Sequence, residues 1–329
     1  MILIYLKLAS PQYRTASQLN PMDDRKPLDA LAASLMLVLC VIWSLQQIAL
    51  KAVGDNVAPM LQIALRSGVA FGLVAALMVW RKERFDWRAW RPGLLVGALF
   101  ALEYLFIAEA LRLTSAGHTV VFLYTSPVFA AIGLHLKLPA ERLSVTQWGG
   151  IALAFGGVAY AFLGGDAASA HASTQVSLWG DVLALLGGAA WGATTVAIRT
   201  TRLSVTAPNQ TLLYQLGGAF CLLLPVAVLT GQTYFRPTPL VWLSLAYQTF
   251  IMSFASLLAW FWLLRHYLAS RLGVFTFLTP VLGVVLGALI LGEALEPQFV
   301  LGALIVLMGL ATVSLHTAMA AMARRLLTR

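Results

Sequence analysis

Long apolar runs with short polar connections recur along the chain from residue 29 onward. Each run approaches or exceeds the roughly 20 residues with which an α-helix crosses the hydrocarbon layer of a membrane. The composition agrees, because only 11% of the residues are charged and the mean hydropathy is +0.83, whereas soluble domains are about 25% charged. The expected spans are residues 29–50, 59–80, 92–111, 118–137, 147–164, 178–198, 208–229, 240–263, 272–291 and 298–317. We therefore predict an all-α membrane protein with ten transmembrane helices.

The basic residues are distributed unevenly between the connections. With a cytoplasmic N-terminus, the other side of the membrane holds only Lys51, Arg112 and Arg236, while Arg66 lies within a span. The remaining 18 of the 22 Lys and Arg residues lie in segments 1–28, 81–91, 137–142, 199–202, 265–271 and 324–329. Because basic loops stay in the cytoplasm, both termini are predicted to be cytoplasmic. The net charge of +9 then reflects topology and not a nucleic-acid partner.

One helix-length pattern occurs twice. The segment LCVIWSLQQIALK (39–51) returns 148 residues later as GGAAWGATTVAIR (187–199), with Trp43 aligned on Trp191. Pro127 and Pro280 match at a similar offset. Each half then holds five spans, and an odd number of spans gives the halves opposite orientations. Inverted repeats of this kind are typical of secondary transporters.

The duplication sets the expected organisation of the chain. We predict an N-terminal cytoplasmic segment (1–28), a first five-helix repeat (29–164), a linker (165–177), a second five-helix repeat (178–317) and a basic C-terminal tail (318–329). The linker GGDAASAHASTQV is small and polar, which is typical of a flexible connection.

Two stretches carry a resemblance to a known family. They are LTPVLGVVLGALILGEAL (278–295) and TSPVFAAIGLHLKLPAERL (125–143), and the second has LPAE where the first has LGE. With the five-plus-five duplication, they resemble the EamA branch of the drug/metabolite transporter superfamily over about residues 29–317. The resemblance implies a ten-helix exporter of the bacterial inner membrane. It also implies a central cavity lined mainly by spans one, three, four, six, eight and nine.

Charged residues inside spans are the sharpest functional signal, because a charge at the bilayer centre costs at least about 2.5–3.5 kcal/mol. Glu103 lies near the middle of span three, and Glu109 and Arg66 lie at similar depths in spans three and two. Arg66 and Glu109 are expected to form an ion pair, with Arg112 as a competing partner three residues from Glu109. Glu103 is either a hydrogen-bonded core carboxyl or a group that carries protons or binds a substrate ammonium.

Aromatic and polar side chains within the spans form the candidate substrate site. Trp43 and Gln47 share one helical face, as do Trp191 and Thr195, and inverted symmetry is expected to bring the two faces together near the midplane. Such walls suit small amphipathic molecules, although plain helix packing is the alternative for each residue. The candidate substrate-binding residues are Trp43, Gln46, Gln47, Glu103, Tyr124, Trp191, Thr195, Tyr247, Ser253 and Trp260.

Two prolines lie inside spans four and nine. Pro127 and Pro280 each remove a backbone hydrogen bond and permit a bend. We interpret them as hinges of an alternating-access movement, with static kinks as the alternative.

The sequence lacks the motifs of an ATP-driven pump or a hydrolytic enzyme. It holds no Walker-type loop, no His pair at metal spacing and no GxSxG motif. Cys40 and Cys221 both lie in apolar spans and predict neither a disulfide nor a metal site. We expect no cofactor, no metal and no enzymatic activity. The expected partners are a small-molecule substrate and the lipid bilayer, with the chain as a monomer or homodimer.

Together these features predict a secondary transporter that works without ATP. It would export small metabolites, amino acids foremost, by alternating access through a central midplane cavity. A multidrug or lipophilic-cation exporter is the alternative of the same class, with Glu103 as the counter-charge. A membrane-embedded enzyme or a receptor-like protein is the alternative of another class.

Overall fold

The computed structural model describes most of the chain beyond the N-terminal segment. The described residues are 29–138, 143–163, 177–267, 272, 275–276 and 278–327. Their regular structure is helical, with one isolated antiparallel bridge between Val57 and Phe235. The predicted N-terminal segment 1–28, nearly all of the linker 165–177 and the last two residues of the predicted tail lie outside the described residues.

Five of the predicted spans account for the helices of the first half. These helices are α2 (Ala30–Ala52), α3 (Pro59–Trp80), the 3₁₀ turn η1 (Trp87–Ala89), α4 (Trp90–Leu113), α5 (Ala116–Leu123), α6 (Ser126–Lys137) and α7 (Val145–Leu163). Asp29 caps the first of them, because its Oδ1 accepts the N–H of Ala32 at 2.8 Å.

The second half follows the same order of elements. It contains α8 (Leu178–Thr200), the 3₁₀ turn η3 (Arg202–Val205), α9 (Pro208–Leu229), α10 (Pro239–Ala246), the π-helix η4 (Tyr247–Ser256), α11 (Leu257–His266), α13 (Leu278–Leu291) and α14 (Pro297–Leu327). Proline occupies the first position of α9 and of α10, where its missing N–H costs nothing.

Seven helical stretches in the described part of the chain are long and apolar enough to cross a membrane. Residues 278–291 and 297–312 form shorter apolar helices. Large apolar side chains remain exposed on many of these helices, including Leu94 and Leu289, and such surface suits contact with lipid. Trp80, Trp90 and Trp179 are exposed near helix ends, where tryptophan is enriched at membrane interfaces. The protein is therefore a multi-pass membrane protein.

The fourth predicted span is broken into two helices. Tyr124 and Thr125 separate α5 from α6, and Pro127 occupies the second position of α6. Proline lacks the N–H that would continue the helix through this point. Gly188 of α8 packs against the break, where a Cβ atom would lie 2.8 Å from the carbonyl oxygen of Phe122. The glycine thus allows α8 to approach the interrupted backbone.

The eighth predicted span changes its helical winding. Its middle, Tyr247–Ser256, is a π-helix between the α-helical α10 and α11. π-helical turns are rare and frequently occur at functional sites. In the ninth span, Pro280 is buried near the start of α13. Whether Pro127 and Pro280 act as hinges stays a prediction.

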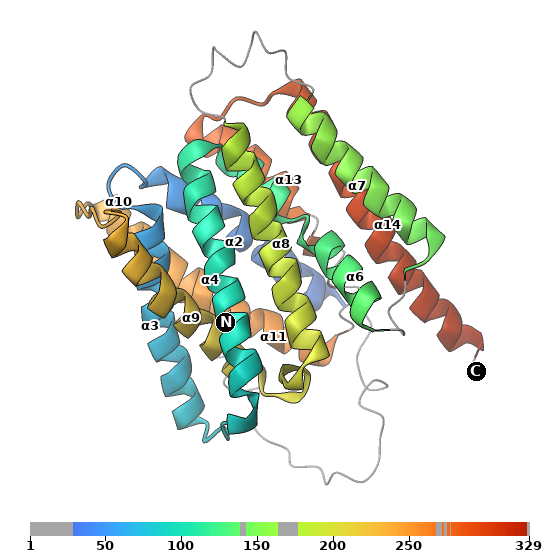
Figure 1. Ribbon diagram of the computed structural model, residues 1–329, viewed down its shortest axis with the longest axis horizontal. Helices are drawn as coiled ribbons and strands as arrows, with labels where there is room; N and C mark the ends of the chain where they lie inside the picture. Colours follow the sequence, from blue (N-terminus) through green and yellow to red (C-terminus); the bar gives the residue numbers. More distant parts are fainter. Residues whose placement is uncertain are drawn as a thin grey trace.

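Helices of the two halves pack on one another across the molecule (Figure 1). α4 packs on α8 and α9, α3 on α9, and α13 on α2 and α5. α7 and α14 run side by side along one edge. There Gly302 approaches Gly157 so closely that a Cβ atom would lie 2.9 Å from the carbonyl oxygen of Gly157. Small residues at such contacts are typical of membrane helix pairs.

Candidate substrate site

Arg66 of α3 is a buried cation with neutral hydrogen-bond partners. Its side chain is 2% exposed, and Nη1 donates to Oε1 of Gln248 in η4 at 3.3 Å. The same nitrogen lies 3.8 Å from the sulfur of Met252, and the guanidinium carbon lies 4.6 Å from the ring centroid of Tyr104. Nε is buried without a partner. Within the described part of the chain, no carboxylate forms an ion pair with Arg66.

Glu103 of α4 contributes the carboxyl group of this region. It is 4% exposed and interacts electrostatically with Arg66. Its Oε2 atom is nevertheless buried without a hydrogen-bond partner. An unpaired buried polar atom costs about 1–3 kcal/mol, and more when the group is charged. Glu103 is thus poised to accept a hydrogen bond from another molecule.

Gln248 holds Arg66 through a chain of amide contacts. Its Nε2 donates to Oε1 of Gln62 at 3.0 Å and to the hydroxyl of Ser244 at 2.9 Å. Ser244 in turn donates to the carbonyl oxygen of Ala49 in α2. These bonds orient the amide so that its oxygen faces the guanidinium. They connect α2 and α3 of the first half to α10 and η4 of the second.

The two glutamines of α2 differ in their contacts. Gln46 donates from Nε2 to the hydroxyl of Tyr104 at 3.2 Å, whereas Oε1 of Gln47 is buried without a partner. An unsatisfied amide oxygen within a membrane span is costly. We call the polar residues connected around Arg66 the central polar cluster: Gln46, Gln62, Arg66, Glu103, Tyr104 and Gln248.

The predicted aromatic residues divide into two groups. Trp43 packs edge-on against Trp260, with ring centroids 5.5 Å apart, and donates from Nε1 to the hydroxyl of Ser256 at 3.1 Å. Trp191 packs edge-on against Tyr124 at 5.3 Å. No ring contact joins Trp43 to Trp191 among the residues that the structure describes. Each tryptophan instead contacts an aromatic ring of the opposite half.

Three further predicted residues spend their hydroxyl groups within the protein. Thr195 donates to a backbone carbonyl of its own helix, α8. Tyr247 donates to the carbonyl of Ile42 in α2. Ser253 contacts the sulfur of the preceding Met252. Tyr247 therefore fixes η4 against α2, while Thr195 and Ser253 have local partners.

Glu109 pairs with Arg112 and does not pair with Arg66. The Arg112 Nη1 to Glu109 Oε2 distance is 2.7 Å, and Gln232 of the α9–α10 connection donates to Oε1 of Glu109 at 2.7 Å. The competing pair is therefore formed within α4. Arg66 faces η4, because its nearest hydrogen-bond acceptor is Gln248.

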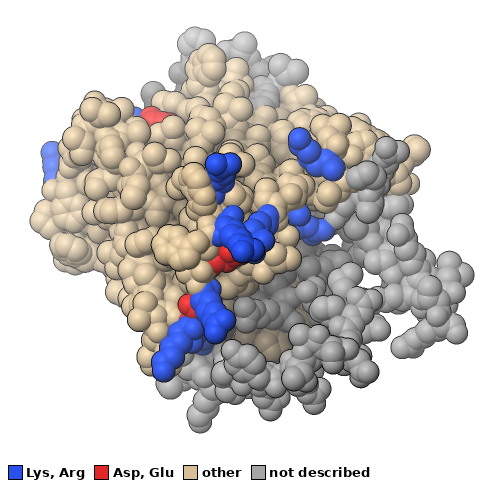
Figure 2. Space-filling view, turned by 60° about the horizontal axis from the view of Figure 1, so that its bottom comes forward, with Lys and Arg blue, Asp and Glu red and all other residues tan. Residues whose placement is uncertain are grey.

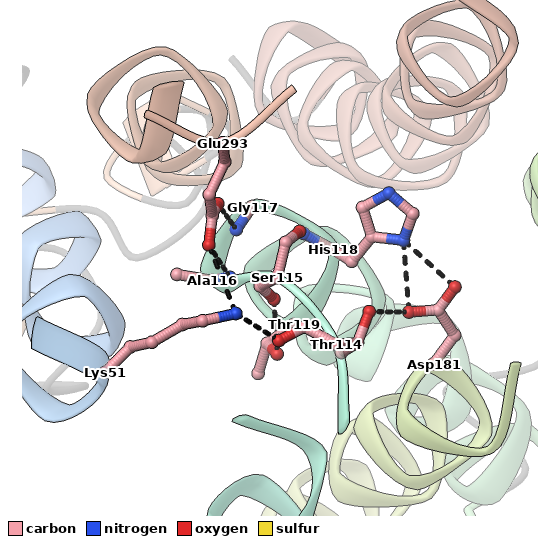
Figure 3. A network of polar contacts seen from close by, with 9 residues as sticks. All are labelled: Lys51, Thr114, Ser115, Ala116, Gly117, His118, Thr119, Asp181 and Glu293. Atoms are coloured by element: carbon pink, nitrogen blue, oxygen red, sulfur yellow. Dashed lines mark hydrogen bonds and ion pairs between the residues drawn. The ribbon is translucent and has the colours of Figure 1, made fainter. Parts of the chain in front are cut away.

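A second polar group surrounds the turn between α4 and α5 (Figure 3). Glu293, which follows α13, accepts the N–H groups of Ala116 and Gly117 at 2.6 and 3.0 Å. The ammonium of Lys51, at the end of α2, lies 3.4 Å from the same carboxylate. The positive end of the α5 dipole also favours an anion at this position. Glu293 therefore fastens the second half to two helices of the first.

Asp181 makes the corresponding contacts from the start of α8. It accepts the hydroxyl of Thr114 at 2.6 Å, and its Oδ2 lies 2.9 Å from Nδ1 of His118. The imidazole of His118 stacks on Phe299 of α14 with 3.6 Å between ring centroids. We call this group the α4–α5 network, and its members are Lys51, Thr114, Ser115, His118, Asp181 and Glu293.

The sequence-based analysis missed several of these residues. Gln62, Gln248 and Asp181 are polar residues within apolar spans, which is the same signal that identified Glu103. Glu293 is the acidic residue of the LGEAL motif, so the motif itself marked it. The partners of these residues could not be read from the sequence, because each contact joins positions at least 63 residues apart.

The opposite end of the helices carries the basic connections. Arg202 of η3 donates from Nε to Asp86 Oδ2 at 2.7 Å, and this hydrogen bond is the main cause of a lowered pKa for the Asp86 carboxyl. Asn209 donates to Glu83 at 2.9 Å. Figure 2 shows Lys and Arg side chains gathered on this face. The two halves therefore also contact one another here, through exposed ion pairs and amides.

Comparison with known proteins places the chain in a family. The family model described as EamA-like transporter family matches residues 30–163 and again residues 178–315. A Bacillus subtilis (strain 168) protein described as "Uncharacterized transporter YoaV" is 24% identical over 281 residues, which cover 82% of this chain and 92% of that protein. A structure described only as "Crystal structure of protein" matches at 20% identity with a TM-score of 0.58, over 91% of this chain and 99% of the other. At this identity the structural match shows a shared fold alone.

Proposed function

The chain belongs to the EamA-like transporter family, and from this premise we propose that it is a secondary transporter that exports small metabolites, amino acids foremost, without ATP. Ten spans arranged as two inverted five-helix repeats rock about a central midplane site. This movement exposes the site to each side of the membrane in turn. The observation that carries the proposal is the central polar cluster, which joins the two halves inside the membrane.

The packing of the helices supports an inverted repeat. The contact of α2 with α13 has a counterpart in the contact of α8 with α6, in which the two halves exchange roles. The contact of α4 with α9 corresponds in the same way to that of α3 with η4. Such paired contacts are expected when a two-fold axis relates the halves. The repeats of the proposal are residues 29–164 and 178–317.

The distribution of charge supports a cytoplasmic location for both termini. The basic face in Figure 2 includes the connections after α3 and after α8. Basic connections remain on the cytoplasmic side, which places the α4–α5 network on the outer side. In the bacterial inner membrane, export then proceeds from the basic face toward this network.

The central polar cluster lies where a rocking movement changes contacts. Arg66 belongs to the first half and its partner Gln248 to the second. The unpaired oxygens of Glu103 and Gln47 supply acceptors. The Tyr124–Trp191 contact supplies an apolar wall between the halves. A small amphipathic substrate needs this combination of polar anchors and apolar surface.

Glu103 is proposed to couple transport to protons. Its carboxyl lies in an enclosed site with an unpaired oxygen, so a change in its charge alters the electrostatics of the site strongly. Binding of a substrate ammonium and binding of a proton are then competing ways to neutralise it.

Transport by the purified protein in liposomes tests the proposal. A panel of labelled amino acids is measured with and without a pH gradient, for the wild type and for Glu103→Gln. We expect flux that the gradient drives and that Glu103→Gln abolishes. Gradient-independent flux that tolerates the substitution would make Glu103 structural and the transport facilitated. Flux of lipophilic cations without flux of any amino acid would refute the substrate class and favour the multidrug alternative.

A further inference from the structure

We propose that Arg66 is the receptor for a carboxylate of the substrate, and that the substrate is a zwitterion whose ammonium group is bound by Glu103. This inference rests on the proposed transport function and specifies its substrate chemistry. It starts from the hydrogen-bonding capacity that the central polar cluster leaves unused.

The guanidinium of Arg66 has more donors than partners. It carries five N–H groups and remains protonated in proteins. Its printed partners are the oxygen of Gln248 and the sulfur of Met252, and both bind Nη1. Nε is buried without a partner. A buried cation is stable only when opposite charge and hydrogen bonds compensate for its lost hydration, and neutral side chains supply only part of this compensation.

An anionic group of the ligand completes these interactions. The planar fork of arginine matches the two oxygens of a carboxylate, which it binds through parallel hydrogen bonds. Tyr104 supports the guanidinium from its ring face at 4.6 Å, and Gln248 is held by Gln62 and Ser244. The receptor is therefore oriented before a ligand arrives.

The unused acceptors nearby point to a ligand that also carries a cation. Oε2 of Glu103 and Oε1 of Gln47 are both buried without partners. Each belongs to a residue adjacent in sequence to a bonded pair, because Gln46 donates to Tyr104. Glu103 interacts electrostatically with Arg66. Spare donors and spare acceptors thus occur in one cluster, which suits a molecule with both charges.

A lone cation or a lone anion fits this cluster less well. A lipophilic cation would be attracted by Glu103 but repelled by Arg66, and it would leave the N–H groups of Arg66 unpaired. A simple carboxylate would satisfy Arg66 and leave the oxygen of Glu103 unpaired. An α-amino acid satisfies both groups at once, and its side chain can lie against the aromatic pair Tyr124 and Trp191.

Three compounds with one side chain test the inference in the wild-type protein. They are L-leucine, its carboxamide L-leucinamide and its deaminated analogue 4-methylpentanoate. Binding to the purified protein in detergent is measured by isothermal titration calorimetry and by thermal stabilisation. We expect L-leucine to bind at least about tenfold more tightly than L-leucinamide, because an ionic hydrogen-bonded contact is lost. The carboxylate-only compound is expected to bind between the two.

Variants assign the preference to Arg66. Arg66→Gln and Arg66→Lys are compared with Arg112→Gln, a control that removes an exposed arginine paired with Glu109. We expect Arg66→Gln to bind L-leucine and L-leucinamide equally, Arg66→Lys to retain part of the preference, and the control to retain all of it. Should Arg66→Gln fail to fold, the ligand series in the wild type still decides.

The outcomes separate this inference from the proposed function. Amino-acid flux with equal affinity for L-leucine and L-leucinamide would overturn the inference and leave the transport function standing. Carboxylate-dependent binding without amino-acid flux would refute amino-acid export and support the assignment of Arg66. Replacing L-leucine by each other amino acid and its amide covers a different side-chain preference. A panel in which no acid binds better than its amide would overturn the inference.

Discussion

Replacement of Glu293 by glutamine is expected to weaken the contact between the two halves at the α4–α5 turn. The carboxylate is 7% exposed and accepts two backbone N–H groups of α5. Glutamine keeps one acceptor oxygen and puts an NH₂ group where the second oxygen was. One N–H of Ala116 or Gly117 then lacks a partner, which costs about 1–3 kcal/mol.

Two smaller contributions add to this loss. Removal of the anion from the N-terminus of α5 costs about 0.3–1 kcal/mol. The Lys51 contact contributes at most about 1 kcal/mol, because Lys51 is 23% exposed and its partner distance is 3.4 Å. The expected total is about 2–4 kcal/mol. Gly287 leaves the space that Glu293 occupies, since a Cβ atom there would lie 2.6 Å from Oε2.

Equilibrium unfolding in mixed detergent micelles, titrated with sodium dodecyl sulfate, measures this loss. The matched control is Glu296→Gln, which makes the same charge change three residues later at an exposed position. The control is expected to change the free energy of unfolding by less than about 0.5 kcal/mol. Equal effects of the two substitutions would show that the loss comes from net charge, and the reasoning from hydrogen bonds would be refuted.

Three further predictions concern other contacts between the halves. Gly218→Ala is expected to lower the unfolding midpoint by about 1–3 kcal/mol of stability, because its Cβ would lie 2.4 Å from the carbonyl oxygen of Gly97, whereas Gly72→Ala meets nothing within 4 Å and should have little effect. Trp43→Phe keeps the aromatic contact but removes the donor to Ser256, so a loss of about 1 kcal/mol is expected in the same assay. The pKa of Asp86 is lowered by the hydrogen bond from Arg202, so this pair stabilises the fold above the ordinary carboxyl pKa of 3.8 and loses its effect as the pH falls through the lowered value. Arg202→Gln should accordingly reduce the midpoint at pH 7 more than in acid, and an effect of equal size at both pH values would exclude this mechanism.

The helices were predictable because a single physical quantity determines them. Hydropathy identifies a span without reference to any other span, so the predicted segments 59–80 and 208–229 coincide with α3 and α9. Pro127 predicted an interruption of the fourth span for an equally local reason. The π-helix Tyr247–Ser256 had no such signal, because its sequence is compatible with an ordinary α-helix.

The contacts between spans were less predictable, as Arg66 shows. Its expected partner was Glu109, because the two residues lie at similar depth in the membrane. Depth is only one coordinate, and it does not say which way a side chain points around its helix. Arg66 points toward η4, whereas Glu109 is paired within its own helix. The polar residues of η4 and α8 that complete both networks required knowledge of helix packing.

The two ends of the molecule hold the halves together with unequal strength. At the α4–α5 network, the carboxylates of Asp181 and Glu293 are almost fully buried and accept several hydrogen bonds. At the basic face, Arg202 and Asp86 are 45% and 30% exposed, and exposed ion pairs contribute at most about 1 kcal/mol. Separating a buried pair costs more, because each charge keeps its desolvation penalty until water reaches it. Within the proposed alternating-access cycle, opening at the α4–α5 network therefore requires more free energy than opening at the basic face, and a substrate bound in the central polar cluster must supply the difference.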